Sequence, residues 1–264
     1  MFYSSESSSS STRPDPPADV PAVELRHVTK SFGPHRVLDD LCLAVPRGRS
    51  LCILGRSGTG KSVALKHIIG LVKPDSGSVL IEGEDITEMP IRDLARVRKR
   101  IGFLFQNSAL FDSISVGENV AFPLRRHTRR ADAEIRASAQ ELLQRVGLGE
   151  EYDKMPADLS GGMRKRAGLA RALALEPALL LADEPSAGLD PITAAEIDAL
   201  LVDLKHRSNT TLVVVTHNIP SARTIGDELV FLHEGRLLAH GTAHELEGSD
   251  SSLVREFMQS EGAG

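Results

Sequence analysis

The sequence contains little of what would mark a secreted, membrane-spanning or disulfide-bonded protein. It has no Trp and 2 Cys in 264 residues, and only 4% of its residues are aromatic. No apolar run approaches the ~20 residues needed to cross a bilayer, and the N-terminus carries neither the basic nor the apolar segment of a secretion signal. We therefore expect a cytoplasmic protein that reaches a membrane only through a partner.

The sequence also lacks paired cysteines and a net positive charge. Cys42 and Cys52 lack CxxC spacing, and each falls in an apolar run typical of a strand, so we expect two reduced thiols in the core. A net charge of -5 provides no general attraction to a phosphate backbone. We accordingly expect no nucleic-acid partner.

The composition does provide for a folded domain. Hydrophobic residues make up 41% of the chain, which is ample for a core. Residues 1–20 are rich in Ser and Pro, and such a segment buries too little apolar surface to offset the entropy of ordering it. We expect a disordered tail over residues 1–20 and a single domain over residues 21–264.

Hydrophobic periodicity predicts an α/β protein. The early runs VELRHV, VLDDLCLAV, SLCIL and GSVLIEG predict an antiparallel sheet packed beside a phosphate-binding core. Residues 115–175 have a helical pattern with a break at Gly147. After them, the apolar runs ALLLAD, TLVVVT and ELVFLHEGRLLAHG alternate with helical segments, which is typical of a buried parallel sheet. The run SSLVREFMQS predicts a closing amphipathic helix.

The clearest motif is GRSGTGKS, which lies between the apolar run LCIL and the helical run VALKHIIGL. Its glycines allow the backbone to wrap around phosphate oxygens, with N–H groups converging at the start of a helix. Lys61 would reach the β- and γ-phosphates, and Ser62 would bind Mg²⁺. The motif consists of Gly55, Arg56, Ser57, Gly58, Thr59, Gly60, Lys61 and Ser62. The loop alone does not separate kinases, switches, motors and transport ATPases.

Two further motifs place polar groups at the end of a strand and at the start of a helix. ALLLADEP contains Asp183 and Glu184, which could hold Mg²⁺ and polarise a water, or could form a solvated turn. Together with a phosphate loop, the first interpretation is favoured. LSGGM opens a helical run, so Ser160 and the glycines after it offer a hydroxyl and free N–H groups to an anion. The alternative for Ser160 is a plain N-cap.

With these motifs in this order, the sequence resembles the ATP-binding cassette family from Val23 to its C-terminus. The order is the phosphate loop, FQNSALF with Gln106, LSGGM, LLLADEP, SAGLD ending in Asp190, and VVVTHN with His217. The resemblance implies an α/β P-loop ATPase fold. That fold has a RecA-like parallel-sheet core, an antiparallel β subdomain and a helical subdomain, here at about residues 107–175.

The resemblance also implies that the chain forms a homodimer. In this family two subunits enclose two ATP molecules head to tail, and the signature motif of each subunit contacts the ATP of the other. Ser160, Gly161 and Gly162 would make these contacts, and Asp190 would communicate across the dimer. Met163 stands where the signature usually has Gln, so the glycine N–H groups would bind without a side-chain amide beside them.

The remaining site residues also follow from the resemblance. Phe32 would stack on adenine where relatives often have Tyr, and Val63 would complete the nucleotide-binding segment after the loop. Glu184 would be the general base, and His217 would contact the γ-phosphate. The expected catalytic residues are Glu184, His217, Gln106 and Lys61, and the expected Mg²⁺ ligands are Ser62, Gln106 and Asp183.

Transport is the commonest use of this cassette, which implies a separate integral-membrane permease, with this chain bound peripherally at the cytoplasmic face of the inner (plasma) membrane. The segment NSALFDSISVGENVAFPLR and the motif LSGGM resemble the corresponding sequences in the ATPases of bacterial phospholipid-trafficking systems that maintain lipid asymmetry. That resemblance adds a membrane-anchored lipid-binding subunit to the expected partners. The alternative is the ATPase of an importer for a small polar solute such as an amino acid.

Other classes fit the sequence less well. A ribosome-associated cassette protein would carry two cassettes in tandem, and a chromosome or DNA-repair cassette would carry a long coiled coil between phosphate loop and signature. A small-molecule kinase would lack LSGG. We therefore expect a transport ATPase.

Overall fold

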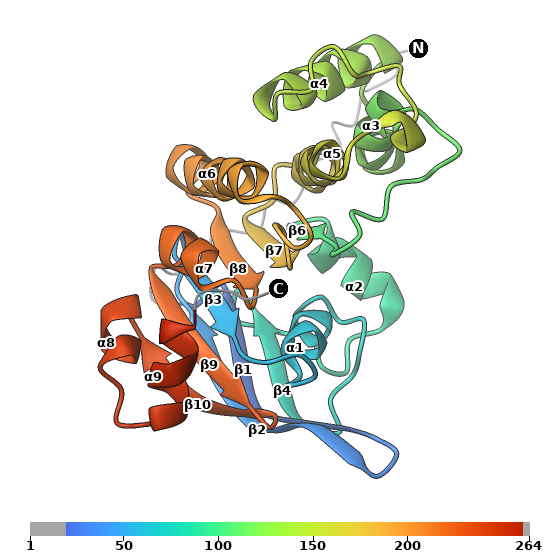
Figure 1. The fold of residues 1–264 in the computed structure, drawn as a ribbon. Coiled ribbons are helices and arrows are strands. Elements are labelled where there is room, and N and C mark those ends of the chain that lie inside the picture. The colour runs from blue at the N-terminus through green and yellow to red at the C-terminus, as the bar shows by residue number, and fades with distance from the viewer. Residues whose placement is uncertain (1–19, 261–264) are drawn as a thin grey trace, which may run out of the picture.

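The computed structural model describes residues 20–260, which form two sheets with helices packed around them (Figure 1). The disordered tail predicted for residues 1–20 lies outside the described residues, apart from Val20. The mixture of parallel sheet, antiparallel sheet and helices confirms the predicted α/β class.

The smaller sheet is antiparallel throughout and has the strand order β2-β1-β4-β5. It consists of β1 (Val23–Phe32), β2 (His35–Val45), β4 (Ser76–Ile81) and β5 (Glu84–Asp85). Alternate residues of these strands face the core, as expected for a sheet with one solvated face.

The larger sheet has the strand order β10-β9-β3-β8-β7-β6. It consists of β3 (Ser50–Leu54), β6 (Ile101–Leu104), β7 (Leu179–Asp183), β8 (Thr211–Val215), β9 (Glu228–His233) and β10 (Arg236–Gly241). All neighbouring pairs are parallel except β9 and β10, which a tight turn at Glu234 and Gly235 joins as an antiparallel hairpin.

Two local predictions about these strands were wrong. SLCIL clusters with the strands of the antiparallel sheet in sequence, yet it is β3, inside the parallel sheet between β9 and β8. All five of its residues are buried, because β3 is covered on both faces. The run ELVFLHEGRLLAHG forms β9 and β10, of which only β9 belongs to the parallel part of the sheet.

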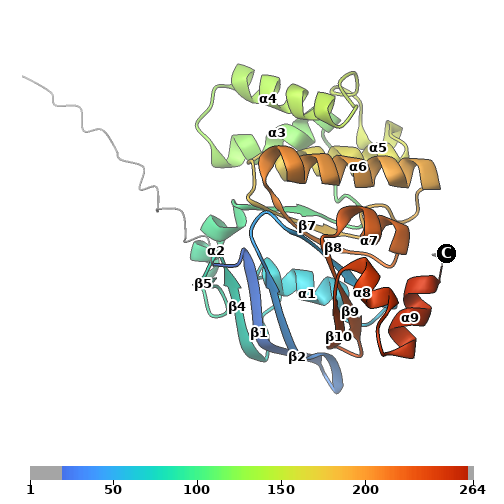
Figure 2. The ribbon, with the colours of Figure 1, turned by 90° about the vertical axis from the view of Figure 1, so that its left-hand side faces the viewer.

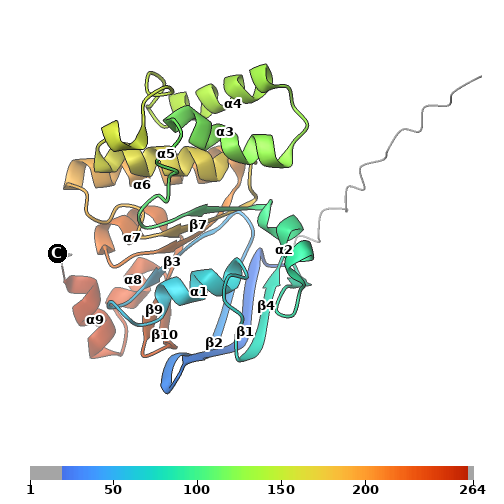
Figure 3. The ribbon, with the colours of Figure 1, turned by 90° about the vertical axis from the view of Figure 1, so that its right-hand side faces the viewer.

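Helices cover the larger sheet and extend to one side of it, where α3, α4 and α5 pack together (Figures 2 and 3). The helices are α1 (Lys61–Ile68), α2 (Ile91–Arg98), α3 (Val116–His127), α4 (Asp132–Arg145), the 3-10 helix η1 (Pro156–Asp158), α5 (Gly161–Leu173), α6 (Pro191–Ser208), α7 (Ile219–Ile225), α8 (Ala243–Glu247) and α9 (Ser252–Gln259). The predicted break at Gly147 follows α4, where the glycine adopts a φ of 72°. Within residues 20–260, no helix has the length and apolarity needed to span a bilayer.

The strands of the parallel sheet divide their side chains between two hydrophobic cores. In β3, Cys52 and Leu54 face the core that includes α3, α5 and α6. Leu51 and Ile53 face the core that includes α1 and the antiparallel sheet. This two-residue alternation is what a strand buried on both faces requires. The two cores therefore pack against opposite faces of β3 up to its carboxyl end.

The prediction of two core thiols was correct for Cys52 and wrong for Cys42. Cys52 is fully buried, whereas Cys42 is exposed. Cys42 lies in β2 between Leu41 and Leu43, which are both buried. Because successive side chains of a strand point to opposite faces, the thiol between two inward leucines points outward.

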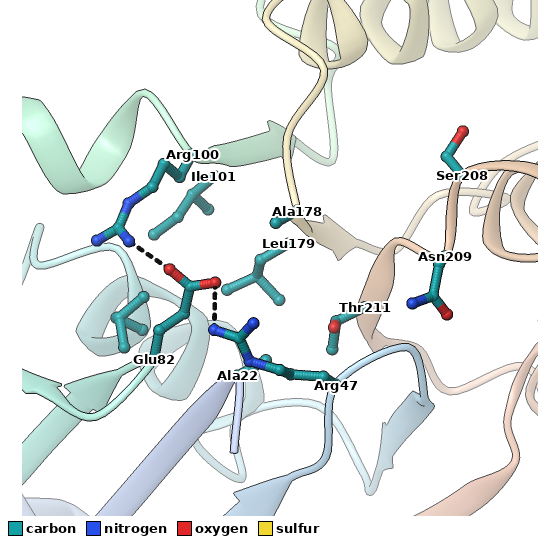
Figure 4. Close-up of a pocket in the computed structure, with 11 residues that line it drawn as sticks. Ala22, Arg47, Glu82, Arg100, Ile101, Ala178, Leu179, Ser208, Asn209 and Thr211 are labelled. Atoms are coloured by element: carbon teal, nitrogen blue, oxygen red, sulfur yellow. Dashed lines mark hydrogen bonds and ion pairs between the residues drawn. The ribbon is translucent and has the colours of Figure 1, made fainter. Parts of the chain in front are cut away.

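A partly buried charge cluster joins the two sheets at the end remote from the carboxyl ends of the parallel strands (Figure 4). Glu82 follows β4 of the antiparallel sheet and accepts hydrogen bonds from Arg47, at 2.8 Å, and from Arg100. Arg100 precedes β6 of the parallel sheet. The cluster lines a cavity together with Leu179 and Thr211, the first residues of β7 and β8, so it belongs to the edge opposite the phosphate loop.

Candidate active site

The predicted phosphate loop connects the carboxyl end of β3 to the start of α1. Gly60 is the N-cap of α1, with a φ of 99° and no side-chain hydrogen bond, and the first turn contains no acidic residue. The N–H groups of that turn therefore keep their hydrogen-bonding capacity for an anion. This arrangement fits a phosphate ligand.

Two glycines of the loop are required by close contacts with neighbouring backbone. A Cβ at Gly55 would lie 2.3 Å from the carbonyl oxygen of Leu232, and one at Gly60 would lie 2.6 Å from that of Val37. No side chain fits at either position without moving β9 or β2. The curvature of the loop is thus set by tertiary contacts as well as by its own sequence.

Lys61 is buried and its ammonium lies within the curve of the loop. Nζ donates hydrogen bonds to the carbonyl oxygens of Gly55, at 2.7 Å, and Arg56, at 3.0 Å. Desolvation lowers the pKa of the Lys61 ammonium, while Glu184 and Asp183 oppose that shift by favouring the charged form. A cation held at the mouth of a loop with free N–H groups is suited to bind phosphate oxygens.

Ser62 and Asp183 place a hydroxyl and a carboxylate side by side next to Lys61. The Ser62 hydroxyl donates to Asp183 Oδ1 over 2.9 Å, which joins the first turn of α1 to the last residue of β7. Burial raises the pKa of the Asp183 carboxyl, and the hydrogen bond from Ser62 partly offsets the increase. A hydroxyl and a carboxylate at this separation are the hard oxygen donors that Mg²⁺ prefers, so the residues present fit a Mg²⁺-bound nucleotide.

Glu184 lies directly after β7 and contacts His217, which follows β8. Glu184 Oε1 is 2.9 Å from His217 Nδ1, and the Glu184 N–H donates to the carbonyl oxygen of Val215 at 2.8 Å. Glu184 has a φ of 49°, in the left-handed region that non-glycine residues rarely occupy. Such conformations persist only where surrounding contacts impose them, and they concentrate at active sites.

The signature residues and Asp190 form a second group of predicted site residues. Ser160 is the N-cap of α5 and accepts a hydrogen bond from the Met163 N–H at 3.2 Å. Asp190 is the N-cap of α6, and its Oδ2 accepts from the Thr193 hydroxyl at 2.6 Å. A Cβ on Gly162 would lie 2.5 Å from Thr193 Cγ2, so the starts of α5 and α6 are in direct contact.

Most of the remaining predicted residues lie at the surface. Phe32, at the end of β1, is 50% exposed, with Lys30 Nζ 5.5 Å from its ring centroid, so its ring is accessible for stacking. Gln106 is exposed in the turn after β6. Arg56, Ser57, Gly58 and Gly161 are exposed, and Val63 is half-buried. The Thr59 hydroxyl donates a hydrogen bond to the carbonyl oxygen of Arg56.

Sequence reasoning missed a buried cation at the same place. Lys165 on α5 is 6% exposed, and its Nζ donates to the carbonyl oxygen of Glu184 at 2.9 Å and to that of Gln106. A signal was available in the sequence. The segment AGLARA shortly after Lys165 is rich in small residues, and such residues allow a helix to pack closely enough to enclose a long side chain beside them.

Comparisons with known proteins agree with this geometry. The family model described as ABC transporter matches residues 38–187. The chain is 46% identical over 237 residues to the probable ribonucleotide transport ATP-binding protein mkl of Mycobacterium leprae, covering 90% of this chain and 68% of that one. It is 41% identical over 236 residues to the intermembrane phospholipid transport system ATP-binding protein MlaF of Escherichia coli K12, covering 89% and 88%.

The solved structures with similar folds include the ATP-binding cassette MJ0796 in a dimeric post-hydrolysis state bound to ADP and Pi. The TM-score is 0.78 at 35% sequence identity, over 83% of this chain and 98% of that chain. The fold, the phosphate loop and the paired carboxylates therefore have one explanation. The chain belongs to the ABC transporter family and is an ATP-hydrolysing subunit of that family.

Proposed function

We propose that this subunit drives a separate permease that moves phospholipid between membranes of the cell envelope. The observation that carries the proposal is the similarity to the phospholipid transport protein MlaF, which extends over 89% of this chain and 88% of that protein. The aligned region therefore includes the segment after Gln106, whose sequence resembles that of lipid-trafficking ATPases.

The surface around that segment supports a permease partner. Phe105, Phe111 and Phe122 are 38–45% exposed and line one groove between β6, α3 and α5. The rings of Phe111 and Phe122 pack with centroids 5.0 Å apart. Exposed aromatic clusters of this kind mark protein interaction sites, and we propose that a cytoplasmic helix of the permease docks here.

The proposed chemistry follows from the contacts of Lys61, Ser62, Asp183 and Glu184. Lys61 and the loop N–H groups would hold the phosphates of ATP, while Ser62, Asp183 and the exposed Gln106 side chain would hold Mg²⁺. Bound Mg²⁺ would neutralise charge on the phosphate oxygens. Glu184 orients an attacking water and accepts its proton.

His217 and Phe32 complete the proposed site. His217, whose Nδ1 lies 2.9 Å from Glu184 Oε1, contacts the γ-phosphate, while Phe32 stacks on the adenine.

The second group of site residues is proposed to act on a second subunit. Ser160 and Gly161 are exposed at the start of α5, next to the Asp190 loop, so this surface is open to a partner. The dimeric state of MJ0796 supports a homodimer in which this surface closes over the nucleotide of the other copy. We place the dimer on the cytoplasmic face of the inner membrane, with the permease and a membrane-anchored lipid-binding subunit.

A small polar solute is the second candidate for the substrate. The relative that is 46% identical is described as a probable ribonucleotide transport protein. That description favours a solute importer built on the same ATPase.

The test is to purify the tagged chain from mildly solubilised membranes of its native cell and to identify the chains and lipids that accompany it. A multi-span permease with an anchored lipid-binding subunit and phospholipid would support the lipid assignment. A permease with a soluble solute receptor would overturn it in favour of the importer.

A matched pair of variants tests the docking groove in the same experiment. Phe122→Asp should release the permease, whereas Leu238→Asp, which changes a side chain of nearly equal exposure on β10, should retain it. Equal recovery of the permease with both variants would place the docking surface elsewhere.

A further inference from the structure

Lys165 has no assigned role, yet it is among the most enclosed charges of the described residues. Its side chain is 6% exposed, and desolvation lowers the pKa of its ammonium, with Glu184 and Asp183 opposing the shift. A buried cation is costly unless it is paired or hydrogen-bonded. Here the partners are two backbone carbonyl oxygens, those of Gln106 and of Glu184, the latter at 2.9 Å.

These two carbonyls belong to the two segments that carry the predicted Mg²⁺ and water contacts. Gln106 lies in the turn after β6, and Glu184 lies directly after the neighbouring strand β7. The Glu184 backbone has a φ of 49°, so an external contact is needed to hold it. The Lys165 ammonium supplies that contact at the Glu184 carbonyl oxygen, while the Glu184 N–H donates to the carbonyl oxygen of Val215.

The same face of α5 also donates hydrogen bonds to the rest of the turn after Gln106. Arg171 donates to the carbonyl oxygens of Ser108 and Ala109, both at 2.7 Å, and these residues have φ values of 59° and 48°. Between the two cations lies Gly168, where a Cβ would come within 3.0 Å of Ser108 Cβ. Residues three apart on a helix share a face, so Lys165, Gly168 and Arg171 form one stripe against this turn.

We propose that Lys165 is a positioning residue for ATP hydrolysis, which holds the backbones at Gln106 and Glu184 in a fixed relation to the helix that begins at the signature motif. The inference rests on the proposed roles of Gln106 and Glu184. Lys165 acts through these two backbones and has no contact with substrate in this role. Displacement of α5 would therefore move the Gln106 turn and the Glu184 carboxylate together.

The test measures steady-state ATP hydrolysis, ATP affinity and melting temperature for the full chain and its variants. Lys165→Met removes the cation and leaves the carbonyl oxygens of Gln106 and Glu184 without this donor. We expect kcat to fall by about tenfold to a hundredfold, because small displacements of catalytic groups have effects of that order. ATP affinity should stay within about twofold, since the Lys165 ammonium bonds to the carbonyl oxygens of Gln106 and Glu184 and not to those of the phosphate loop.

Two further variants separate positioning from stability. Lys165→Arg keeps a cation with several N–H donors and should recover most of the lost kcat. Arg98→Met is the matched control, because Arg98 also donates to two carbonyl oxygens, those of Ile69 at 3.0 Å and Gly70 at 2.8 Å, which follow α1 and are not residues of the candidate site. It should lower the melting temperature and leave kcat within about twofold of wild type.

The outcomes distinguish this inference from the assignments on which it rests. A wild-type kcat in Lys165→Met, or equal losses of kcat in Lys165→Met and Arg98→Met, would overturn the positioning role. If Lys165→Met does not fold, Lys165→Gln is judged by the same criteria, because its amide can still pair one carbonyl. Full hydrolysis by Glu184→Gln would instead show that the role of Glu184 is wrong.

Discussion

Nδ1 of His217 lies 2.9 Å from Oε1 of Glu184, although the two residues follow different strands and are separated in sequence by α6. Both follow the carboxyl ends of neighbouring parallel strands, whose register places Asp183 opposite Val215. The pairing of the strands therefore brings a carboxylate and an imidazole together beside the phosphate loop. A ligand at this edge would meet both groups at once.

Replacing Glu184 with Gln should separate binding from hydrolysis. The amide keeps the size of the side chain but cannot accept a proton from water, so we expect kcat to fall by about a hundredfold or more. ATP should still bind, and the closed dimer should accumulate in its presence, which size-exclusion chromatography would detect. Turnover at the wild-type rate would contradict the assignment of Glu184 as the base.

Replacing Lys61 with Ala should instead weaken the binding of ATP. It removes a charged donor to phosphate, and contacts of that kind contribute about 1.5–3 kcal/mol, equivalent to roughly tenfold to a hundredfold in affinity. Titration with a fluorescent ATP analogue measures the loss. Lys73→Ala, which removes an exposed lysine outside the loop, is the control, and equal affinities in both variants would remove Lys61 from the phosphate site.

Two glycines of the phosphate loop provide a matched pair for testing its geometry. Gly58 and Gly60 both have positive φ, but a Cβ at Gly58 would meet nothing within 4 Å, whereas one at Gly60 would lie 2.6 Å from the Val37 carbonyl oxygen. Gly58→Ala should cost about 1 kcal/mol of folding free energy from its backbone conformation. Gly60→Ala should cost a further ~1–3 kcal/mol from overpacking against β2. Urea unfolding would measure the difference, and equal midpoints would show that β2 does not constrain the loop.

The two cysteines should differ sharply in reactivity. Burial raises the pKa of the Cys52 thiol, which removes the reactive thiolate, whereas Cys42 is exposed on β2. Iodoacetamide should therefore modify Cys42 in the native protein and Cys52 only after unfolding, as read by mass spectrometry of the two peptides. The Cys42→Ser variant should take up no label while folded. Equal labelling of both native cysteines would contradict the placement of β2 and β3.

The order of motifs along the chain was enough to predict the family and the α/β class, because the phosphate loop, LSGGM and LLLADEP are local patterns. The same locality explains the errors. SLCIL and Cys42 each lie in an apolar strand-like run, but the run itself does not say which sheet it joins or which face points outward. Those choices depend on pairing partners distant in sequence.

Local sequence also determined where backbone N–H groups would be free, because Gly60 and Ser160 stand at helix starts. Only the tertiary structure decided which distant groups would share an environment. The parallel pairing of β7 with β8 and the packing of α1 bring Ser62 to Asp183 and Glu184 to His217. Lys165 shows this dependence most clearly. Nothing in its own segment requires a buried ammonium, and its position follows from α5 packing over two strand ends whose carbonyls it can reach.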